Sequence, residues 1–347
     1  MAITETAFKN CFQSKDPFFF TLHSSFQAYT KLIISYFSHA WEAPLLRLQI
    51  FLCRSIDGAL KNAYNKRDYS DRSLRKMNIR LIVMDIDGTL LGSDGVIPAE
   101  NIRAIKEAQR RGVIVGIASG RIAGNVLCLM ERSGLRCPVI SLNGGRVADE
   151  NNVTLHQQFM EPSSAQAIFD VIDRHRTNYN IMGDGFLYTR RSEALTSQWE
   201  LAFADELHRF NVQYVRNTGE GALYARRPVN KFVLFDTDEL EDMRRELQPV
   251  PHITLTRSAA SNIEIMPEGV DKATGLEVLA RHFGIPMACT MALGDEGNDL
   301  PMLERAGWGV AMGNGSDDAK AAAKAVTDTN DRAGVAQAID RYVLGKA

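Results

Sequence analysis

The sequence predicts an α/β protein, a doubly wound parallel sheet that is interrupted by a second unit of α+β type. Three observations favour this fold class. An apolar run from Leu81 to Met84 leads directly into acidic residues and a glycine, which is typical of a buried strand in a parallel sheet. Strand and helix patterns alternate from Met77 onward, and the alternation changes character between about Glu161 and Asn262. The main sheet is therefore expected to be Rossmann-like, with the second unit inserted into it.

The first 76 residues differ in composition from the rest of the chain. They hold 13 of the 28 aromatic residues but only one of the 26 glycines, Gly58. Charged residues such as Glu42 and Arg47 interrupt their apolar stretches, so neither a spanning helix nor a secretory signal is expected. We interpret residues 1–76 as an atypical, dispensable extension, because Met77 stands immediately before the first strand. A peripheral amphipathic anchor is the alternative interpretation.

The first core segment, residues 77–159, is expected to hold alternating strands and helices and then a hairpin. The expected elements are a strand at 79–84, a helix at 99–111, a strand at 113–118, a helix at 124–132, a strand at 139–142, and a hairpin of Val147 with residues 153–159. Strands that alternate with helices imply right-handed crossovers and hence a parallel sheet. The hairpin lies where the core can pass into an insertion.

Residues 160–262 read as an α+β unit without a catalytic motif. The expected elements are a helix around Ala167 to Ile172, strands near Ile181 and at 186–189, a helix through Trp199 and Leu207, a strand at 232–235, a helix at 240–247 and a strand at 253–256. A strand at 263–266 is expected to resume the core, which then runs from 263 to 347. It is followed by a helix at 272–283, a strand at 291–293, a helix at 301–305, a strand at 308–312 and two more helices.

Composition excludes several classes of partner and site. Lys plus Arg (40) nearly balances Asp plus Glu (42), which gives no electrostatic case for nucleic acid or an anionic membrane as a partner. The five cysteines have no C-x-x-C spacing and the seven histidines form no H-x-x-x-H pair, so neither a disulfide framework nor a zinc site is expected. A cytoplasmic protein fits this cysteine usage best.

Four polar stretches lie at the ends of expected core strands or helices, and their chemistry converges on phosphoryl transfer. They are Asp85-Ile86-Asp87-Gly88-Thr89, Ser119-Gly120-Arg121, Lys272, and Gly294-Asp295-Glu296-Gly297-Asn298-Asp299. Phosphoryl transfer needs a nucleophile, a cation and hydrogen-bond donors for the phosphate oxygens, and a proton donor and acceptor for the leaving oxygen. Asp85 supplies a carboxylate nucleophile that would form an aspartyl-phosphate, and Asp87 is placed to protonate the leaving group. Asp85 and Asp295 suit Mg²⁺, which prefers hard oxygen ligands.

Taken alone, most of these stretches also have a structural, non-catalytic interpretation. Ser119-Gly120 is compatible with an ordinary turn after a strand, and Lys272 with a solvated charge. The run from Gly294 to Asp299 is compatible with an Asx turn and a helix N-cap. Their joint occurrence in this order is what favours a catalytic site.

This set of motifs resembles the haloacid dehalogenase superfamily, and specifically its Cof-type hydrolases, which carry a large α+β cap of C2 type. The resemblance covers residues 77–343. It implies a hydrolase core at 77–159 and 263–347, with the unit at 160–262 as the cap. The site residues that it implies are Asp85 as nucleophile, Asp87 as general acid/base, Lys272 as the charge-stabilising lysine, Ser119 with Gly120 as the phosphate-binding pair, Asn143 and Gly144 on the substrate side, Asn298 as a phosphate or substrate contact, Asp295 as metal ligand, and Asp299 as a supporting carboxylate. Mg²⁺ would be held by Asp85, Asp295 and the backbone carbonyl of Asp87.

An acid at position 87 favours a phosphatase over a dehalogenase, because only a phosphatase has a leaving alkoxide to protonate. The expected function is Mg²⁺-dependent hydrolysis of small phosphorylated metabolites, such as sugar phosphates or flavin or nucleotide monophosphates. A phosphosugar mutase and a non-catalytic sensor of the same fold are the alternatives. Substrate choice is assigned to the cap and to the Asn143 loop. The basic and aromatic candidates of the cap are Arg226, Arg227, Lys231, Tyr188, Trp199 and Tyr224.

Overall fold

The computed structural model describes residues 78–191, 203–216, 218–235, 239–258 and 261–346. The chain divides into two compact regions, Met1–Leu74 and Arg75–Ala347, and every described residue belongs to the latter region. Our interpretation of residues 1–76 therefore lies outside the described residues. Within the ranges above, no helix has both the length and the apolar character that crossing a bilayer requires.

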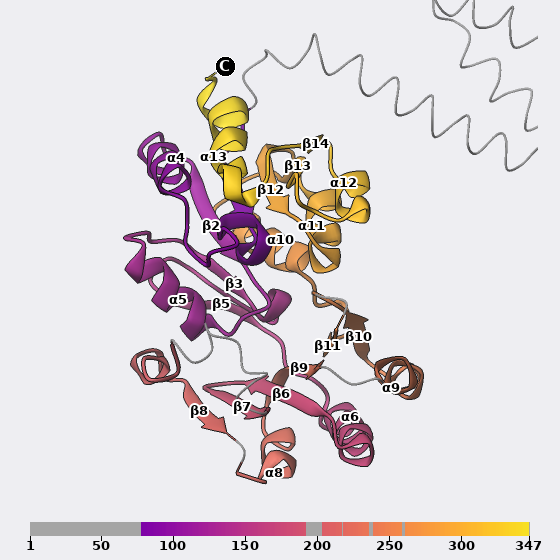
Figure 1. Ribbon diagram of the computed structural model, residues 1–347. Helices are drawn as coiled ribbons and strands as arrows, with labels where there is room; N and C mark the ends of the chain where they lie inside the picture. The colour runs from indigo at the N-terminus through magenta and orange to yellow at the C-terminus, as the bar shows by residue number, and fades with distance from the viewer. Residues whose placement is uncertain (1–77, 192–202, 217, 236–238, 259–260, 347) are drawn as a thin grey trace, which may run out of the picture. The chain divides into compact units, whose positions relative to one another are not determined.

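The core is an eight-stranded sheet with the strand order β14-β13-β12-β1-β2-β3-β4-β5 (Figure 1). Its strands are β1 Leu81–Met84, β2 Ile114–Ala118, β3 Val139–Ser141, β4 Arg146–Ala148, β5 Thr154–Gln157, β12 Thr290–Gly294, β13 Trp308–Ala311 and β14 Ala325–Val326. The six strands from β14 to β3 are parallel, and β4 and β5 add an antiparallel hairpin. The predicted parallel sheet and the predicted hairpin are both confirmed.

The core helices cover both faces of this sheet, which explains the unbroken apolar run of β1. They are α4 Ala99–Arg110, α5 Ala123–Arg132, α10 Lys272–His282, α11 Leu300–Arg305, α12 Asp317–Ala322 and α13 Gly334–Ile339. Ile82 and Met84 pack in one apolar cluster with residues of α4 and α13. Leu81 and Val83 pack in another with residues of α10 and α11. Because successive side chains of a strand point to opposite faces, a strand that is buried on both sides needs apolar residues at every position.

The second unit is built on a six-stranded sheet with the order β10-β11-β9-β6-β7-β8. Its strands are β6 Asn178–Gly183, β7 Phe186–Arg190, β8 Gln213–Arg216, β9 Val229–Phe235, β10 Ile253–Thr256 and β11 Asn262–Pro267, and its helices include α6 Pro162–His175, α8 Gly221–Ala225 and α9 Leu240–Leu247. All strand pairs are antiparallel except β7 with β8. Apolar residues of β6, β9 and β11 pack with α6 and α9, so this unit has a core of its own.

Two expectations for this part of the chain were wrong. The strand at 263–266 does not return to the core: it is β11, which pairs with β9 and β10, for example Ile265 with Phe232. Its apolar alternation fits either sheet, and the chain enters the core again only at α10. Leu207 does not lie in a long helix but begins a 3₁₀ turn, Leu207–Phe210, which ends where Asn211 adopts a φ of 59°. Trp199 lies outside the described residues.

Candidate active site

Three neighbouring parallel strands deliver the acidic and hydroxyl groups of the site to one edge of the core sheet. Asp85 follows β1, Ser119 follows β2 and Asp295 follows β12, and β1 lies between the other two. The chain after Asp85 turns at Gly88, whose φ is 80°. A Cβ atom on Gly88 would lie 2.1 Å from Oδ2 of Asp295, so only glycine allows the turn to pass this close to the carboxylate.

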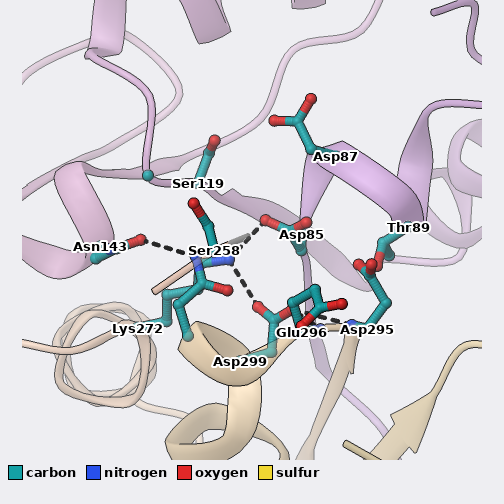
Figure 2. Close-up of polar contacts among 12 residues, drawn as sticks. Asp85, Asp87, Thr89, Ser119, Asn143, Ser258, Lys272, Asp295, Glu296 and Asp299 are labelled. Carbon is teal, nitrogen blue, oxygen red and sulfur yellow. Dashed lines mark hydrogen bonds and ion pairs between the residues drawn. The ribbon is translucent and has the colours of Figure 1, made fainter. Parts of the chain in front are cut away.

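Lys272 occupies the centre of the site rather than the solvent. It stands in the first turn of α10, which is fixed by a capping box between Asp271 and Thr274. Its side chain is fully buried, and Nζ donates to Oδ1 of Asp85 and to Oδ1 of Asp299, both at 2.6 Å (Figure 2). Burial disfavours the ammonium, but the two carboxylates outweigh it and raise the pKa of Lys272. The lysine is therefore charged at every physiological pH.

Asp299 supports the site through hydrogen bonds on both of its carboxylate oxygens. Oδ1 accepts from Lys272, and Oδ2 accepts from the backbone N–H groups of Asp295 and Glu296 at 2.9 and 3.1 Å. These bonds hold the turn after β12 in place. Asp299 thus positions Asp295 and Lys272, which is the arrangement expected of a supporting carboxylate.

Three buried acidic side chains of the site form a cluster that fits a divalent cation. Oxygen atoms of Asp85, Asp295 and Asp299 all lie within 4.8 Å of one another. Burial, and then repulsion from Asp299, raises the pKa of Asp295 to about 7, against an opposing hydrogen bond from Thr89. Burial also raises the pKa of Asp85 well above its usual range, although Lys272 opposes the rise. A bound cation would compensate buried carboxylates that repel one another in this way. Both carboxylate oxygens of Asp299 already accept hydrogen bonds, so Asp85 and Asp295 are the side chains best placed to bind the cation.

Asp87 is exposed at this edge, with 56% of its side chain accessible, whereas Asp85, Asp295 and Asp299 are buried. Arg121, which is buried, grips it in bidentate fashion: Nε donates to Oδ2 at 2.9 Å and a terminal nitrogen donates to Oδ1 at 2.5 Å. Figure 2 shows the Asp87 carboxylate directed away from Lys272 and Asp299. Asp87 therefore lies at the open side of the site.

The other predicted contacts lie on the loops after β2 and β3 and in the turn after β12. Asn143 adopts a left-handed backbone conformation with a φ of 54°, and its N–H donates to the Ser119 carbonyl at 3.0 Å. Asn298 donates from Nδ2 to Oδ1 of Asn143 at 3.4 Å. Gly144 passes so close to α10 that a Cβ atom would lie 2.2 Å from the Asp271 carbonyl oxygen. The structure thus brings Ser119, Asn143, Gly144 and Asn298 to the same edge as Lys272.

A cavity of about 250 Å³ connects this edge to the second unit. The core lines it with Asp85, Asp87, Gly120, Arg121, Glu296 and Asn298, and the second unit lines it with Asn180, Met182, Arg191, Lys231, Val233, Phe235, Ser258, Asn262 and Glu264. A more open depression of about 420 Å³ between α4 and α13 holds none of the predicted site residues. The smaller cavity is therefore the one that can present a substrate to Asp85.

Comparison with known proteins places this geometry in a family. The family model for haloacid dehalogenase-like hydrolases matches residues 82–339, which is most of the chain. The chain belongs to the haloacid dehalogenase-like hydrolase family. It is 31% identical over 268 residues to 5-amino-6-(5-phospho-D-ribitylamino)uracil phosphatase YcsE of Bacillus subtilis, a match that covers 77% of this chain and 97% of that protein.

Further relatives and solved structures agree with this assignment. Phosphatase YwpJ of B. subtilis is 31% identical over 279 residues, with 74% of this chain and 98% of that protein covered. A haloacid dehalogenase-like hydrolase from B. subtilis superimposes with a TM-score of 0.66 at 29% identity, covering 76% of this chain and 99% of the other. The subclass IIB sugar phosphatase BT4131 gives a TM-score of 0.64 at 26% identity, with 76% and 98% covered. As a family member with phosphatase relatives, the chain is a phosphoric monoester hydrolase.

The residues of the second unit that face the site of this hydrolase differ from those predicted from the sequence. Among the five candidates that the structure describes, only Lys231 lines the cavity. Tyr188 and Tyr224 are buried in the cap core, where their rings stack with centroids 4.9 Å apart, and Arg226 and Arg227 are exposed elsewhere. Arg191 and Phe235 were missed: the Arg191 guanidinium lies 3.8 Å from the Phe235 ring centroid, and both line the cavity. Their separation by more than forty residues leaves no local signal in the sequence.

Proposed function

We propose that this hydrolase is a Mg²⁺-dependent phosphatase that cleaves small phosphorylated metabolites through an aspartyl-phosphate on Asp85. The observation that carries the proposal is the placement of Lys272 between Asp85 and Asp299, with Asp295 in the same cluster and the cavity directly in front. A buried cation beside a buried carboxylate both restrains the nucleophile and compensates charge on a phosphoryl group in transfer.

In the first half of the proposed reaction, a carboxylate oxygen of Asp85 attacks phosphorus and the bond from phosphorus to the leaving oxygen breaks. Lys272 restrains Oδ1 of Asp85. A proton on the Asp87 carboxyl group passes to the leaving oxygen, and the alcohol leaves through the open side of the cavity. Ser119 and the N–H groups of its loop are the groups we assign to hold the phosphate oxygens.

In the second half, a water oxygen attacks phosphorus and the bond between phosphorus and Asp85 breaks. Asp87, now a carboxylate, accepts the proton from that water. Inorganic phosphate leaves, and both aspartates return to their initial states. The exposed position of Asp87 suits both proton transfers, because the alcohol leaves and the water enters on the open side of the site.

We assign the Mg²⁺ site to the carboxylates of Asp85 and Asp295 and to the backbone carbonyl of Asp87. The ion would neutralise charge on the phosphate oxygens and on the crowded carboxylates. The raised pKa values of Asp85 and Asp295 support this assignment, because burial and the neighbouring carboxylates disfavour the ionised forms, which a bound cation would stabilise.

We propose further that residues 160–262, extended to Pro267 by β11, form the cap that selects the leaving group. The cap side of the cavity combines apolar Met182, Val233 and Phe235 with polar side chains that include Asn180 and Asn262. Such a lining suits a polar organic leaving group with a planar or polyol part, so sugar phosphates and flavin or nucleotide monophosphates are the classes to test first. The substrate in the name of YcsE joins a phosphorylated polyol to a planar uracil ring, and BT4131 is named a sugar phosphatase. We place the reaction in the cytoplasm, in keeping with the free thiols of Cys128, Cys137 and Cys289.

The test is phosphate release from a panel of sugar phosphates, nucleotide and flavin monophosphates and an aryl phosphate, with Mg²⁺ and with EDTA. Release of inorganic phosphate that requires Mg²⁺ would support the proposal. Isomerisation of a sugar phosphate without net release would favour a mutase. Tight binding of phosphate esters without turnover would favour a sensor. A phosphorylated Asp85, trapped by rapid acid quench and located by mass spectrometry, tests the intermediate.

A further inference from the structure

Lys231 is the only lysine between residues 160 and 262, and it is buried at the boundary of cap and core. It belongs to β9, and only 1% of its side chain is exposed. Nζ donates to Oε1 of Glu264 on β11 at 2.8 Å and to the carbonyl oxygen of Gly120 at 3.1 Å. A cation of the cap is thus bonded to the backbone of the loop that follows β2.

Glu264 gathers three donors from different parts of the chain. Lys231 and the Ser258 hydroxyl donate to Oε1, and Nδ2 of Asn143 donates to Oε2 at 2.5 Å. Burial alone would raise the pKa of Glu264, but Lys231 and these hydrogen bonds outweigh it and lower the pKa. The carboxylate is therefore ionised at neutral pH, and its partners are held in fixed directions.

The pair packs tightly against the Gly120 loop, to which the phosphate is assigned, and against the Asn143 loop on the substrate side. A Cβ atom on Gly120 would lie 2.8 Å from Nζ of Lys231, 3.1 Å from Oδ1 of Asn143 and 3.3 Å from Oε1 of Glu264. Lys231, Glu264 and Gly120 all line the cavity that holds Asp85. Any displacement of the pair must therefore move the Gly120 loop or the Asn143 loop.

Stability alone is a weak reason to bury such a pair. Replacing a buried ion pair by apolar side chains of similar volume is often neutral or stabilising, whereas removing one partner is strongly destabilising. This pair also bonds the loop after β2 at Gly120 and the loop after β3 at Asn143, so it fixes the directions of groups that face the substrate.

We propose that Lys231 and Glu264 are positioning residues, through which the cap holds the Gly120 loop and the Asn143 loop in phosphate-binding geometry. This inference rests on the proposed function and extends it: the cap shapes the site for the phosphate as well as the site for the leaving group. A purely structural pair would affect stability only. A positioning pair affects phosphate affinity, and to the same extent for every ester.

The test compares K231M, E264Q and the double variant K231M/E264M with the wild-type full chain. Methionine is close in length to both side chains, so the double variant removes both charges without leaving one unpaired. R245M is the matched control, since Arg245 is an exposed cap cation on α9 that pairs with Asp242. Urea denaturation measures stability, and calorimetric titration with inorganic phosphate in Mg²⁺ measures affinity without requiring turnover.

We expect the double variant to keep wild-type stability and to bind inorganic phosphate at least about tenfold more weakly, because Gly120 and Asn143 have lost charged partners. KM should rise by the same factor for a sugar phosphate and for p-nitrophenyl phosphate, and R245M should match the wild type. E264Q keeps an acceptor oxygen and should give a smaller loss in the same direction.

Unchanged phosphate affinity in the double variant would overturn the inference, as would a KM increase confined to bulky esters. If the double variant proves unstable, the same criteria apply to E264Q. A wild-type protein that binds phosphate but hydrolyses no ester would refute the proposed function, while phosphate affinities of the variants would still decide the role of the pair.

Discussion

Replacing Asp295 with asparagine is expected to stabilise the metal-free protein at neutral pH, although it removes a residue of the site. Asp295 is 6% exposed, and its pKa is raised from 3.8 to about 7, first by burial and then by Asp299. In the unfolded chain the carboxyl group ionises freely. Folding at pH 8 therefore costs about 4 kcal/mol at this position, since each pH unit of difference in pKa corresponds to about 1.4 kcal/mol. Asparagine carries no such cost, and its Oδ1 can still accept the hydrogen bond from Thr89.

The stabilisation by D295N depends on pH, because Asp295 loses its proton at a higher pH in the folded state than in the unfolded state. Below about pH 4, Asp295 is protonated in both states and contributes nothing. Between the unfolded pKa and the folded pKa, the folded state holds the proton and the unfolded state does not, so wild-type stability falls as pH rises. Above about pH 7 the cost is constant. Because Asp85 titrates in the same cluster and can share the proton, about 4 kcal/mol is the upper limit for the stabilisation by D295N.

Urea denaturation at pH 5 and pH 8, with EDTA and with Mg²⁺, measures the effect. In EDTA at pH 8, the free energy of unfolding of D295N should exceed that of the wild type by about 1–4 kcal/mol. This difference should shrink towards pH 5. Adding Mg²⁺ at about 100 times its Kd should stabilise the wild type by about 2.7 kcal/mol and leave D295N nearly unchanged. If D295N were less stable than the wild type at pH 8 in EDTA, the electrostatic reading of this cluster would be wrong.

Four further predictions concern activity. D85N should keep its fold but lose several orders of magnitude in kcat, and a variant that retained a tenth of the wild-type rate would exclude Asp85 as the nucleophile. Chelation should abolish activity and Mg²⁺ restore it, whereas Ca²⁺, which favours seven or eight ligands, should support it poorly; full activity in excess EDTA contradicts the metal assignment. A chain that begins at Met77 should fold and hydrolyse esters as the full chain does, and insolubility would show that the preceding residues are needed. F235A should lower kcat/KM for sugar or nucleotide esters and spare p-nitrophenyl phosphate, and equal losses for all esters would remove Phe235 from leaving-group selection.

The core of the site could be predicted because its signals are local. Asp85 and Asp87 follow a strand whose apolar residues alternate between two buried clusters, and such a strand must end at the sheet edge where its parallel neighbours also end. The same rule applies to Ser119 and Asp295. Topology alone therefore brings these residues together.

The cap side of the site could not be predicted because its partners are far apart in sequence. Lys231 is the one charged residue of β9, and its acceptors, Glu264 and Gly120, lie 33 and 111 positions away. Arg121 was part of a recognised motif, but its partner Asp87 lies 34 positions earlier. The strand β11 was assigned to the wrong sheet for the same reason, since alternation gives the face of a strand but not its neighbour.

These long-range contacts change how work is divided between the two sheets. The sequence analysis assigned the phosphate to the core motifs, and the choice of leaving group to the cap and the Asn143 loop. However, Asn143 bonds to Glu264 of β11 on one side and to Asn298 of the core on the other, and Gly120 bonds to Lys231 of β9. If the cap pair positions these loops, cap substitutions fall into two classes: changes at Phe235 or Arg191 alter the preference among esters, and changes at Lys231 or Glu264 alter all esters alike. Engineering of specificity in this enzyme should then vary the first class and leave the second intact.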